Sequence, residues 1–312
     1  MRVAVIDLGT NTFHLLIVEV SEKSIFTNLY EEKAPARIGA DGISKGIIGE
    51  QAFERGINII IDLSEKINES GVAKDKIFAA GTSAIRNAAN GEAFVNEIFN
   101  KTGIQVEIIN GEREAELIYR GVKNAVKLGM QPVLIMDIGG GSVEFIIGNE
   151  EKVFWKKSFE IGGQRLIDKF MTSDPMPPAN VEKMIEFLEA TLIPLTDAVY
   201  EYKPKTLVGA AGTFDTLVEI YHKEDNPDFD ISLQTEYGLP IPSFYMIYQS
   251  LLYLNREQRL QIPGMIALRA DMIVVACCLL NFVMQKYDIS TLKTATYALK
   301  EGLLAEKQLQ TN

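Results

Sequence analysis

Two short segments place an aspartate directly before a glycine-containing turn, an arrangement that suits the binding of an oxyanion. Asp7 is followed by the letters LGTNT, and Asp137 is followed by IGGGS. Glycine lets the backbone approach a phosphate closely, and hydroxyl, amide and backbone N–H groups can then donate hydrogen bonds to it. A simple hairpin turn would explain one such segment, but two copies favour phosphate binding. The candidate phosphate-binding residues are Gly9, Thr10, Asn11, Thr12, Gly139, Gly140, Gly141 and Ser142.

Each of these turns lies between two apolar runs that read as strands. The first turn joins residues 2–7 to 13–20, and the second joins 133–137 to 143–148. Both copies therefore read as strand, tight turn and antiparallel strand. The repetition predicts two similar domains, each of which opens with a hairpin.

The elements between and after the hairpins are those of an α/β protein, because helical periodicity alternates with short apolar strands. We expect the domains to span residues 1–129 and 130–298, with a hinge at 130–132 and the C-terminal helix, about 299–312, packing back on the first domain. The other expected helices span residues 49–70, 112–128 and 178–202, the last of them bent or divided at Pro194. The other expected strands span residues 76–80, 105–109, 153–161, 206–208 and 290–295.

Two further segments could bind phosphate beside the hairpin turns. Thr82, Ser83 and Arg86 follow a short strand, so hydroxyl groups and a guanidinium could hold an anion there. Helix capping and a surface arginine are an equal alternative. Gly212 and Thr213 follow a buried strand in a Gly/Ala-rich run, for which close strand–helix packing is the alternative explanation.

Composition and charge limit the classes of partner. The net charge of −11 argues against a general binder of nucleic acid or of a membrane surface, which would need a basic footprint. A polyanion can still be held locally by backbone N–H groups, a few cations and a metal. With only His14 and His222 in the chain, a histidine-built zinc site is excluded, and a hard metal ion on oxygen ligands is expected instead.

The cysteines and the apolar stretches indicate the cellular compartment in which the protein is expected. Cys277 and Cys278 are adjacent within an apolar stretch, so they predict core residues and a reducing compartment rather than a disulfide. The longest apolar stretch, 272–280, is too short to span a membrane, and the N-terminus reads as a strand rather than an export signal. We expect a cytoplasmic protein with no membrane contact.

Several motifs, in order along nearly the whole chain, resemble those of the exopolyphosphatase/guanosine pentaphosphate phosphohydrolase family. They are RIG (37–39) with Gly42 and Gly46, GTSAIR (81–86), GEREAELI (111–118), GGGSVE (139–144) and RAD (269–271). The paired turns resemble the phosphate loops of the wider actin-like superfamily. The resemblance implies two duplicated actin-like (ribonuclease H-like) domains around a central cleft, hydrolysis of terminal phosphoanhydride bonds, and a requirement for Mg²⁺ (or Mn²⁺).

The same resemblance selects the catalytic candidates. Glu114 matches the family's proposed catalytic glutamate, which would position and activate the attacking water. From the residues alone, Glu112, Glu114 and Glu116 are equivalent acidic residues near a helix start. Glu144 is either exposed to solvent or faces the cleft as a metal ligand or second water-orienting group. Asp7, Asp137 and Glu144 are the candidate ligands of the metal.

The sequence departs from the family pattern in a few places. Lys300 stands where the family commonly has arginine, Ala298 where it has glycine, and residues 276–278 replace a stretch that contains glycine. We expect these positions to lie away from the phosphate loops and to affect packing of the second domain or substrate fit, not the reaction type.

The expected substrates are inorganic polyphosphate and guanosine pentaphosphate, with a homodimer as the expected assembly. An ATP-using kinase or ATPase and a non-catalytic sensor of guanosine penta- or tetraphosphate are the alternatives, because one fold supports all three functions. Longer relatives have additional C-terminal helical domains, whereas this sequence stops near the expected end of the second domain. With a net charge of −11, we therefore expect distributive hydrolysis and no preference for very long chains.

Overall fold

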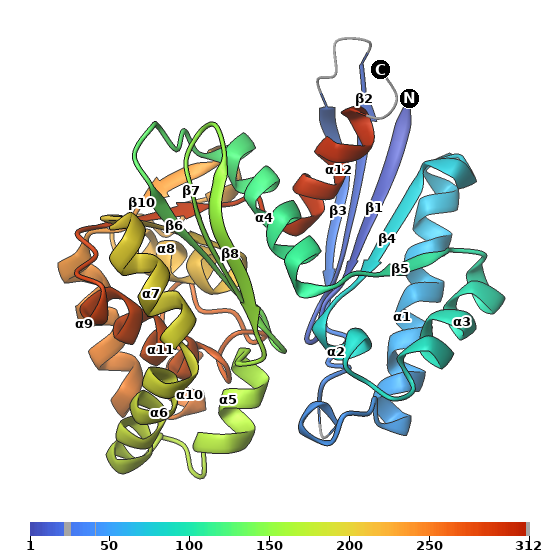
Figure 1. Ribbon diagram of the computed structural model, residues 1–312. Helices are drawn as coiled ribbons and strands as arrows, with labels where there is room; N and C mark the ends of the chain where they lie inside the picture. The colour runs from blue at the N-terminus through green and yellow to red at the C-terminus, as the bar shows by residue number, and fades with distance from the viewer. Residues whose placement is uncertain (22–25, 41, 310–312) are drawn as a thin grey trace.

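The computed structural model describes residues 1–21, 26–40 and 42–309, and its first half is built on a five-stranded mixed sheet (Figure 1). The strand order is β3-β2-β1-β4-β5. The central strands are almost entirely apolar and buried, as expected for a sheet covered on both faces. The strands are β1 (Arg2–Leu8), β2 (Phe13–Val20), β3 (Phe26–Ala34), β4 (Ile77–Gly81) and β5 (Val106–Ile108).

The second sheet repeats the first, with one additional strand. Its order is β10-β11-β9-β6-β7-β8, so β8-β7-β6-β9-β11 corresponds to β3-β2-β1-β4-β5. In both sheets an antiparallel hairpin leads into parallel pairing with a later strand. The predicted α/β fold with duplicated domains is confirmed. The strands are β6 (Val133–Ile138), β7 (Val143–Gly148), β8 (Val153–Phe159), β9 (Thr206–Ala210), β10 (Glu236–Gly238) and β11 (Thr291–Ala295).

Helices cover the outer faces of both sheets. In the first half, α1 and α3 pack on each other and on the sheet. In the second half, α11 is buried along nearly its whole length among α5, α6 and α9. The helices are α1 (Glu50–Glu69), α2 (Ser83–Arg86), α3 (Gly91–Thr102), α4 (Gly111–Ala125), α5 (Gly163–Phe170), α6 (Pro178–Thr191), α7 (Ile193–Tyr202), α8 (Gly212–Lys223), α9 (Ile241–Tyr253), α10 (Arg256–Arg259), α11 (Ile273–Lys286) and α12 (Leu299–Leu309).

Helices α4 and α12 lie between the two sheets, near the middle of Figure 1. Their apolar side chains form one core with side chains from both sheets, among them Val5, Leu16, Ile135 and Val208. Hydrophobic burial at this layer joins the two halves of the molecule. The C-terminal helix thus contacts α4 and β1, although residues 310–312 of the expected helix lie outside the described residues.

Two glycines allow α4 and α12 to approach closely. A Cβ atom at Gly302 would lie 1.8 Å from the carbonyl oxygen of Leu117, and one at Gly121 would lie 2.0 Å from that of Ala298. Both distances are far below van der Waals contact. The sequence Lys-Glu-Gly in α12 therefore includes a glycine for a packing reason.

Most elements agree with the sequence-based expectations within one to three residues. Pro194 divides the predicted helix 178–202 into α6 and α7, because proline is tolerated only in the first turn of a helix. The sequence analysis did not anticipate β3, β10 or the helices α3, α5, α8, α9 and α10.

No helix among the described residues combines the length and apolarity needed to cross a bilayer.

The helix crossing predicts that Gly302→Ala destabilises the protein. Alanine normally favours an interior helix position over glycine by about 1 kcal/mol, but here its methyl group meets the Leu117 carbonyl. We expect a net loss of about 1–3 kcal/mol in the free energy of unfolding, measured by urea denaturation. Gly238→Ala is the control, since a Cβ there meets nothing within 4 Å. Equal stability of the two variants would contradict this account.

Candidate active site

The two predicted phosphate loops have the same local geometry. The backbone N–H of Gly9 donates to the carbonyl of Thr12 at 3.1 Å, and that of Gly139 donates to the carbonyl of Ser142 at 3.0 Å. A Cβ at Gly9 would lie 2.8 Å from the Thr12 oxygen, so the tight turn requires glycine there. The sequence repeat is therefore a repeat of backbone structure.

The two loops also touch each other across the space between the domains. A Cβ atom at Gly141 would lie 2.5 Å from Ser83 Oγ and 2.7 Å from Thr10 Oγ1, and one at Gly140 would lie 2.9 Å from the Asn11 amide. Among the described residues, the N–H groups of Thr10, Asn11, Gly140 and Gly141 form no backbone–backbone hydrogen bond. These donors are therefore available to an anion between the loops.

A neighbouring segment supports the first loop. The N–H groups of Arg37 and Gly39 donate to the carbonyls of Asn11 and Thr10, at 2.9 and 3.1 Å. Arg37 has a φ of 46°, in the left-handed region that side chains rarely adopt. The RIG motif at 37–39 thus acts on the loop through its backbone.

A cavity of about 330 Å³ joins both loops to a set of buried charged residues. Its volume falls in the range of ligand-binding pockets. The predicted residues that line it are Asp7, Gly9, Thr10, Asn11, Thr12, Thr82, Ser83, Glu114, Asp137, Gly139, Gly140, Gly141, Ser142, Glu144 and Gly212.

Asp137 and Glu144 are cross-strand partners in the β6–β7 hairpin. Residues paired in this way lie on the same face of a sheet, so both carboxylates face the cavity. Ser158 Oγ donates to Glu144 Oε1 at 2.6 Å. Burial raises the pKa of both carboxyl groups well above the ordinary range, and the nearby charge of Glu114 raises each further. Glu144 faces the cavity and not solvent.

The first hairpin repeats this pairing with a histidine. Asp7 pairs with His14 as Asp137 pairs with Glu144. Burial, and secondarily the charge of Glu114, raises the pKa of Asp7 to about 7. Burial lowers the pKa of His14 well below its usual value, as do the charges of Lys300 and Lys33. His14 is therefore a neutral residue in the cavity wall.

Glu114 enters the cavity from the first turn of α4, whose cap Asn110 accepts the N–H of Arg113 at 2.8 Å. Arg86 Nη1 donates to Glu114 Oε2 at 2.7 Å and to the Ile109 carbonyl at 3.0 Å. Burial raises the pKa of Glu114, whereas Arg86 opposes that rise. Glu112, by contrast, is exposed, so the structure distinguishes two glutamates that the residue pattern left equivalent.

The carboxylates fit a hard divalent cation. Asp7 Oδ1 is a buried acceptor that has no hydrogen-bond partner, and Asp137 and Glu144 lie side by side. Among the described residues no three acidic, histidine or cysteine side chains form a ready-made metal cage. Magnesium needs only one or two carboxylates because it retains several of its own waters.

Arg269 is a cavity residue that was noted in a motif but not assigned to the site. It is buried, its Nε atom has no hydrogen-bond partner, and a Cβ at Gly212 would lie 2.2 Å from its Nη2 atom. Gly212 therefore makes room for the guanidinium. Burial lowers the pKa of Arg269, against the attraction of Asp215 and Asp137. A buried guanidinium with an unused donor suits a phosphate.

The expectation that Lys300 and Ala298 lie away from the phosphate loops is wrong, since both residues line the same cavity. The Nζ atom of Lys300 lies 2.7 Å from Glu301 Oε1 and 3.3 Å from Glu31 Oε1. Lys33 also lines the cavity and lies 3.8 Å from Asp215. The sequence pattern could not assign Lys33, Asp215 and Lys300 to the site, because they come from β3, α8 and α12, which are far apart in the chain.

Two of the predicted phosphate-binding residues do not line the cavity. Thr213 is completely buried behind Gly212. Arg86 lies one layer behind the wall and contacts Glu114. Thr82, which does line it, also bonds to the strand beside it, since its N–H donates to the Leu8 carbonyl at 3.3 Å.

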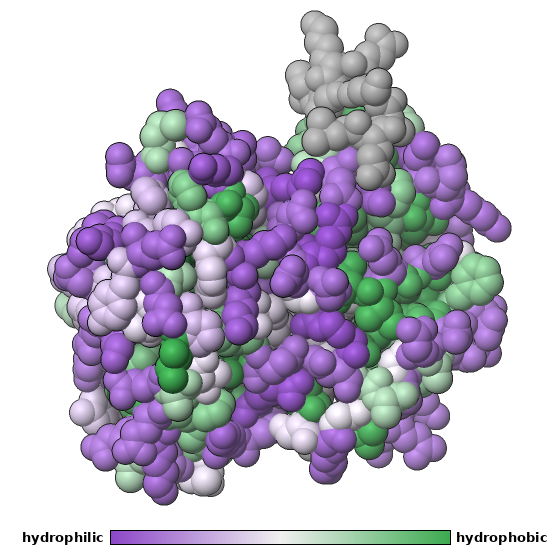
Figure 2. All heavy atoms as spheres, in the orientation of Figure 1, coloured by the Kyte–Doolittle hydropathy of each residue, from purple (hydrophilic) through white to green (hydrophobic). Residues whose placement is uncertain are grey.

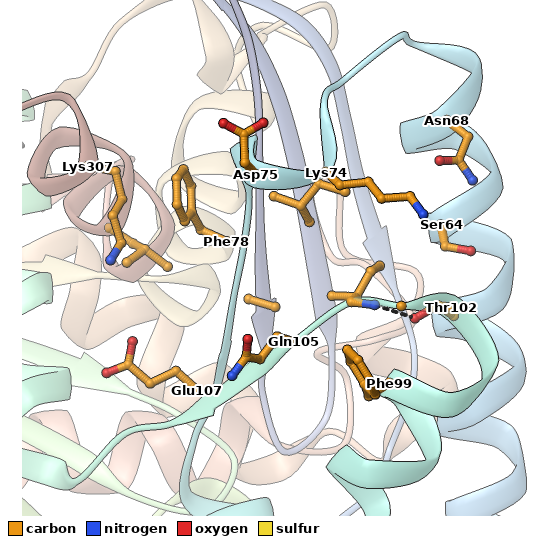
Figure 3. Close-up of a pocket in the computed structure, with 15 residues that line it drawn as sticks. Ser64, Asn68, Lys74, Asp75, Phe78, Phe99, Thr102, Gln105, Glu107 and Lys307 are labelled. Atoms are coloured by element: carbon orange, nitrogen blue, oxygen red, sulfur yellow. Dashed lines mark hydrogen bonds between the residues drawn. The ribbon is translucent and has the colours of Figure 1, made fainter. Parts of the chain in front are cut away.

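A second cavity, of about 520 Å³, shares no lining residue with the first. Figure 3 shows its walls around β4 and β5, with Phe78 beside Lys307. Phe99 is 54% exposed, and a hydrophobic area shows on the corresponding right-hand face in Figure 2. Neither phosphate loop reaches this cavity, so it is not part of the candidate active site.

Comparison with known proteins adds an independent observation. The model of the Ppx/GppA phosphatase family matches residues 16–311. A guanosine-5′-triphosphate,3′-diphosphate pyrophosphatase of Photobacterium profundum is 27% identical over 303 residues, which are 97% of this chain and 58% of that protein. The chain thus spans little more than half the length of this relative.

Solved structures agree with the family match. An exopolyphosphatase from Cytophaga hutchinsonii is 42% identical, with a TM-score of 0.93 over 98% of this chain and 97% of the other. A member of the same family from Aquifex aeolicus is 26% identical, with a TM-score of 0.81 over 100% of this chain and 99% of the other.

The raised pKa of Asp137 predicts that Asp137→Asn stabilises the metal-free protein at pH 8. When folding raises a carboxyl pKa, the folded state binds more protons than the unfolded state above about pH 4, so stability falls as pH rises from there. We expect the melting temperature of the variant to exceed that of the wild type by about 2 °C or more at pH 8, and to match it near pH 4. Exposed Asp197→Asn is the control, and a lower melting temperature at pH 8 would refute the argument.

Proposed function

We propose a function for this chain from the premise that it belongs to the Ppx/GppA phosphatase family. The proposed reaction is hydrolysis of terminal phosphoanhydride bonds of inorganic polyphosphate or guanosine pentaphosphate, with release of orthophosphate. The supporting observation is the convergence of two phosphate-type loops and four carboxylates, three of them buried and that of Asp7 partly buried, on one cavity. The Photobacterium and Cytophaga relatives are named for activities of this kind.

The loops would hold the terminal phosphates of the substrate. The N–H groups of Thr10, Asn11, Gly140 and Gly141 form no backbone hydrogen bond among the described residues, and the two loops that carry them are in contact between the domains. Both loops are fixed before substrate binds, the first by the Arg37–Gly39 backbone and the second by the start of α5, whose Gly163 N–H donates to the Gly139 carbonyl at 2.9 Å. Preorganised donors of this type stabilise charge that develops on phosphoryl oxygens.

Glu114 is the proposed general base. Its raised pKa places the carboxylate nearer to neutral pH, where a base accepts a proton from water most effectively. Arg86 prevents the pKa from rising further and holds the side chain toward the cavity. Glu144, oriented by Ser158, would fix the same water from the other domain.

Asp7, Asp137 and Glu144 are the proposed ligands of Mg²⁺ or Mn²⁺, either directly or through waters that the ion retains. When bound, the ion would neutralise charge on the phosphoryl oxygens and offset the mutual repulsion of the carboxylates. Arg269 would add a fixed positive charge from the protein, because its Nε atom is a buried donor without a partner.

One assay tests the proposal against its rivals. Phosphate release from polyphosphate, guanosine pentaphosphate and ATP would be measured in parallel, with and without Mg²⁺. Release from polyphosphate or guanosine pentaphosphate without ATP supports the proposal. Turnover of ATP alone would indicate a kinase or ATPase, and binding of guanosine pentaphosphate without turnover would indicate a sensor.

We also propose a cytoplasmic location, which the two buried free cysteines support. A homodimer and the absence of nucleic-acid and membrane partners remain predictions from sequence.

The role of Glu114 predicts that Glu114→Gln lowers kcat by about 10²–10⁴-fold, the usual cost of losing a general base. The change keeps the size of the side chain, and far-UV circular dichroism would establish that the fold persists. Glu112→Gln is a matched control in the same turn of α4, with an exposed side chain, and its kcat should change less than about twofold. A folded Glu114→Gln enzyme with more than about a tenth of wild-type kcat would exclude Glu114 as the base.

The carboxylate set also predicts a strict requirement for Mg²⁺ or Mn²⁺. Exhaustive dialysis against a general chelator should abolish phosphate release, and adding Mg²⁺ should restore it. A zinc-selective chelator should have no effect, because oxygen ligands favour hard ions. Full activity after removal of all divalent ions would rule out the metal roles of Asp137 and Glu144.

A further inference from the structure

Glu160 is an acidic residue that lies among groups expected to bind phosphate. It follows β8 in the second domain, and its carboxylate reaches across to the first domain. Ser83 Oγ donates to Glu160 Oε2 at 2.8 Å, and Arg86 Nη2 donates to Oε1 at 3.2 Å. Arg165 Nη2, from α5, donates to Oε2 at 3.1 Å. Donors from both domains thus converge on one carboxylate.

These donors form a site for an anion and not merely a surface ion pair. Two are guanidinium groups, and the amide of Asn87 also favours the charged carboxylate. Together these hydrogen bonds keep the pKa of Glu160 below its usual value although partial burial alone would raise it. The donor set would accept any tetrahedral or planar oxyanion of similar size.

The donor set lies next to the second phosphate loop. Arg165 Nε donates to the Gly141 carbonyl at 2.9 Å. Ser83 Oγ would lie 2.5 Å from a Cβ at Gly141. Arg86 also holds Glu114, the proposed base, with its other nitrogen. An anion bound at these donors would therefore be the neighbour of a phosphate held between the loops.

Glu160 itself is free to leave. Its side chain is 42% exposed, against 9% for Glu114 and 16% for Arg86. Its carboxylate can therefore turn toward solvent once another anion takes over the hydrogen bonds from Ser83, Arg86 and Arg165. The arginines would then lack a carboxylate partner on this side.

We propose that Ser83, Arg86 and Arg165 form a second anion subsite at the domain boundary. Glu160 occupies this subsite in the unliganded protein. A phosphate of an incoming polyphosphate chain displaces Glu160 from it. The subsite deepens the proposed function and rests on it for the identity of the natural ligand. Glu160 acts as an internal competitor, because its negative charge must be moved before a phosphate can bind.

Displacement would also separate the domains at one point. Glu160 belongs to the second domain, whereas Ser83 and Arg86 belong to the first. The bound phosphate would replace this contact with its own bonds to both sides. The same donors thus bind the substrate and keep the boundary closed in its absence.

The test is the affinity for inorganic tripolyphosphate, measured by isothermal titration calorimetry without divalent metal, so that no turnover is needed. Glu160→Gln keeps the shape of the side chain and removes its charge, and it should bind roughly threefold to tenfold more tightly than wild type. The gain should shrink at high salt, because exposed charges are screened. Glu151→Gln is the control, since it removes one exposed charge at the other end of β8 and should leave the affinity unchanged.

Kinetics with Mg²⁺ supply the second measurement. We expect Glu160→Gln to lower KM for polyphosphate by a similar factor, with kcat within about twofold of wild type. Unchanged or weaker binding of tripolyphosphate, or a fall in kcat without a fall in KM, would overturn the inference and make Glu160 a positioning residue for Arg86. If Glu160→Gln tightens binding but neither protein releases phosphate, the subsite stands and the proposed hydrolysis fails.

Discussion

The main constraint on the whole molecule is the placement of several carboxylates next to one another in one cavity, largely shielded from water. Asp7, Glu114, Asp137 and Glu144 meet at one cavity, and their desolvation and mutual repulsion raise every one of their pKa values. Such a cluster is unfavourable in isolation. It persists because the two hairpins hold three of the residues and the start of α4 holds the fourth, within a frame stabilised by three large apolar cores.

Close backbone contact is the second constraint, and glycine provides it in two different places. Between the domains, Gly140 and Gly141 bring one loop against Thr10, Asn11 and Ser83 of the other half. Between α4 and α12, Gly121 and Gly302 bring the helices together. The first contact places the N–H donors, whereas the second orients α4, and with it Glu114, relative to both sheets.

Arg86 links chemistry to domain contact. One nitrogen of its guanidinium holds Glu114 in the first domain, and the other reaches Glu160 in the second. The planar fork of arginine directs its nitrogens at the two carboxylates along fixed directions, whereas the ammonium group of a lysine is a single point charge. Any movement of the second domain therefore changes the surroundings of the proposed base.

The sequence by itself determined the duplicated fold, both loops and the residue types of the chemistry, because these features are local. An aspartate at a strand end, a glycine turn and an apolar alternation can each be read within ten residues. The resemblance to a family singled out Glu114, but only the tertiary structure showed that it enters the cavity while Glu112 is exposed, that Glu144 faces Asp137, and that Thr213 lies behind the wall. Only the tertiary structure placed Arg269, Lys33 and Lys300 beside the loops and Glu160 on the donors of the other domain. These relations join residues that are far apart in the chain, and the packing of two sheets around α4 and α12 sets their distances, which no local pattern records.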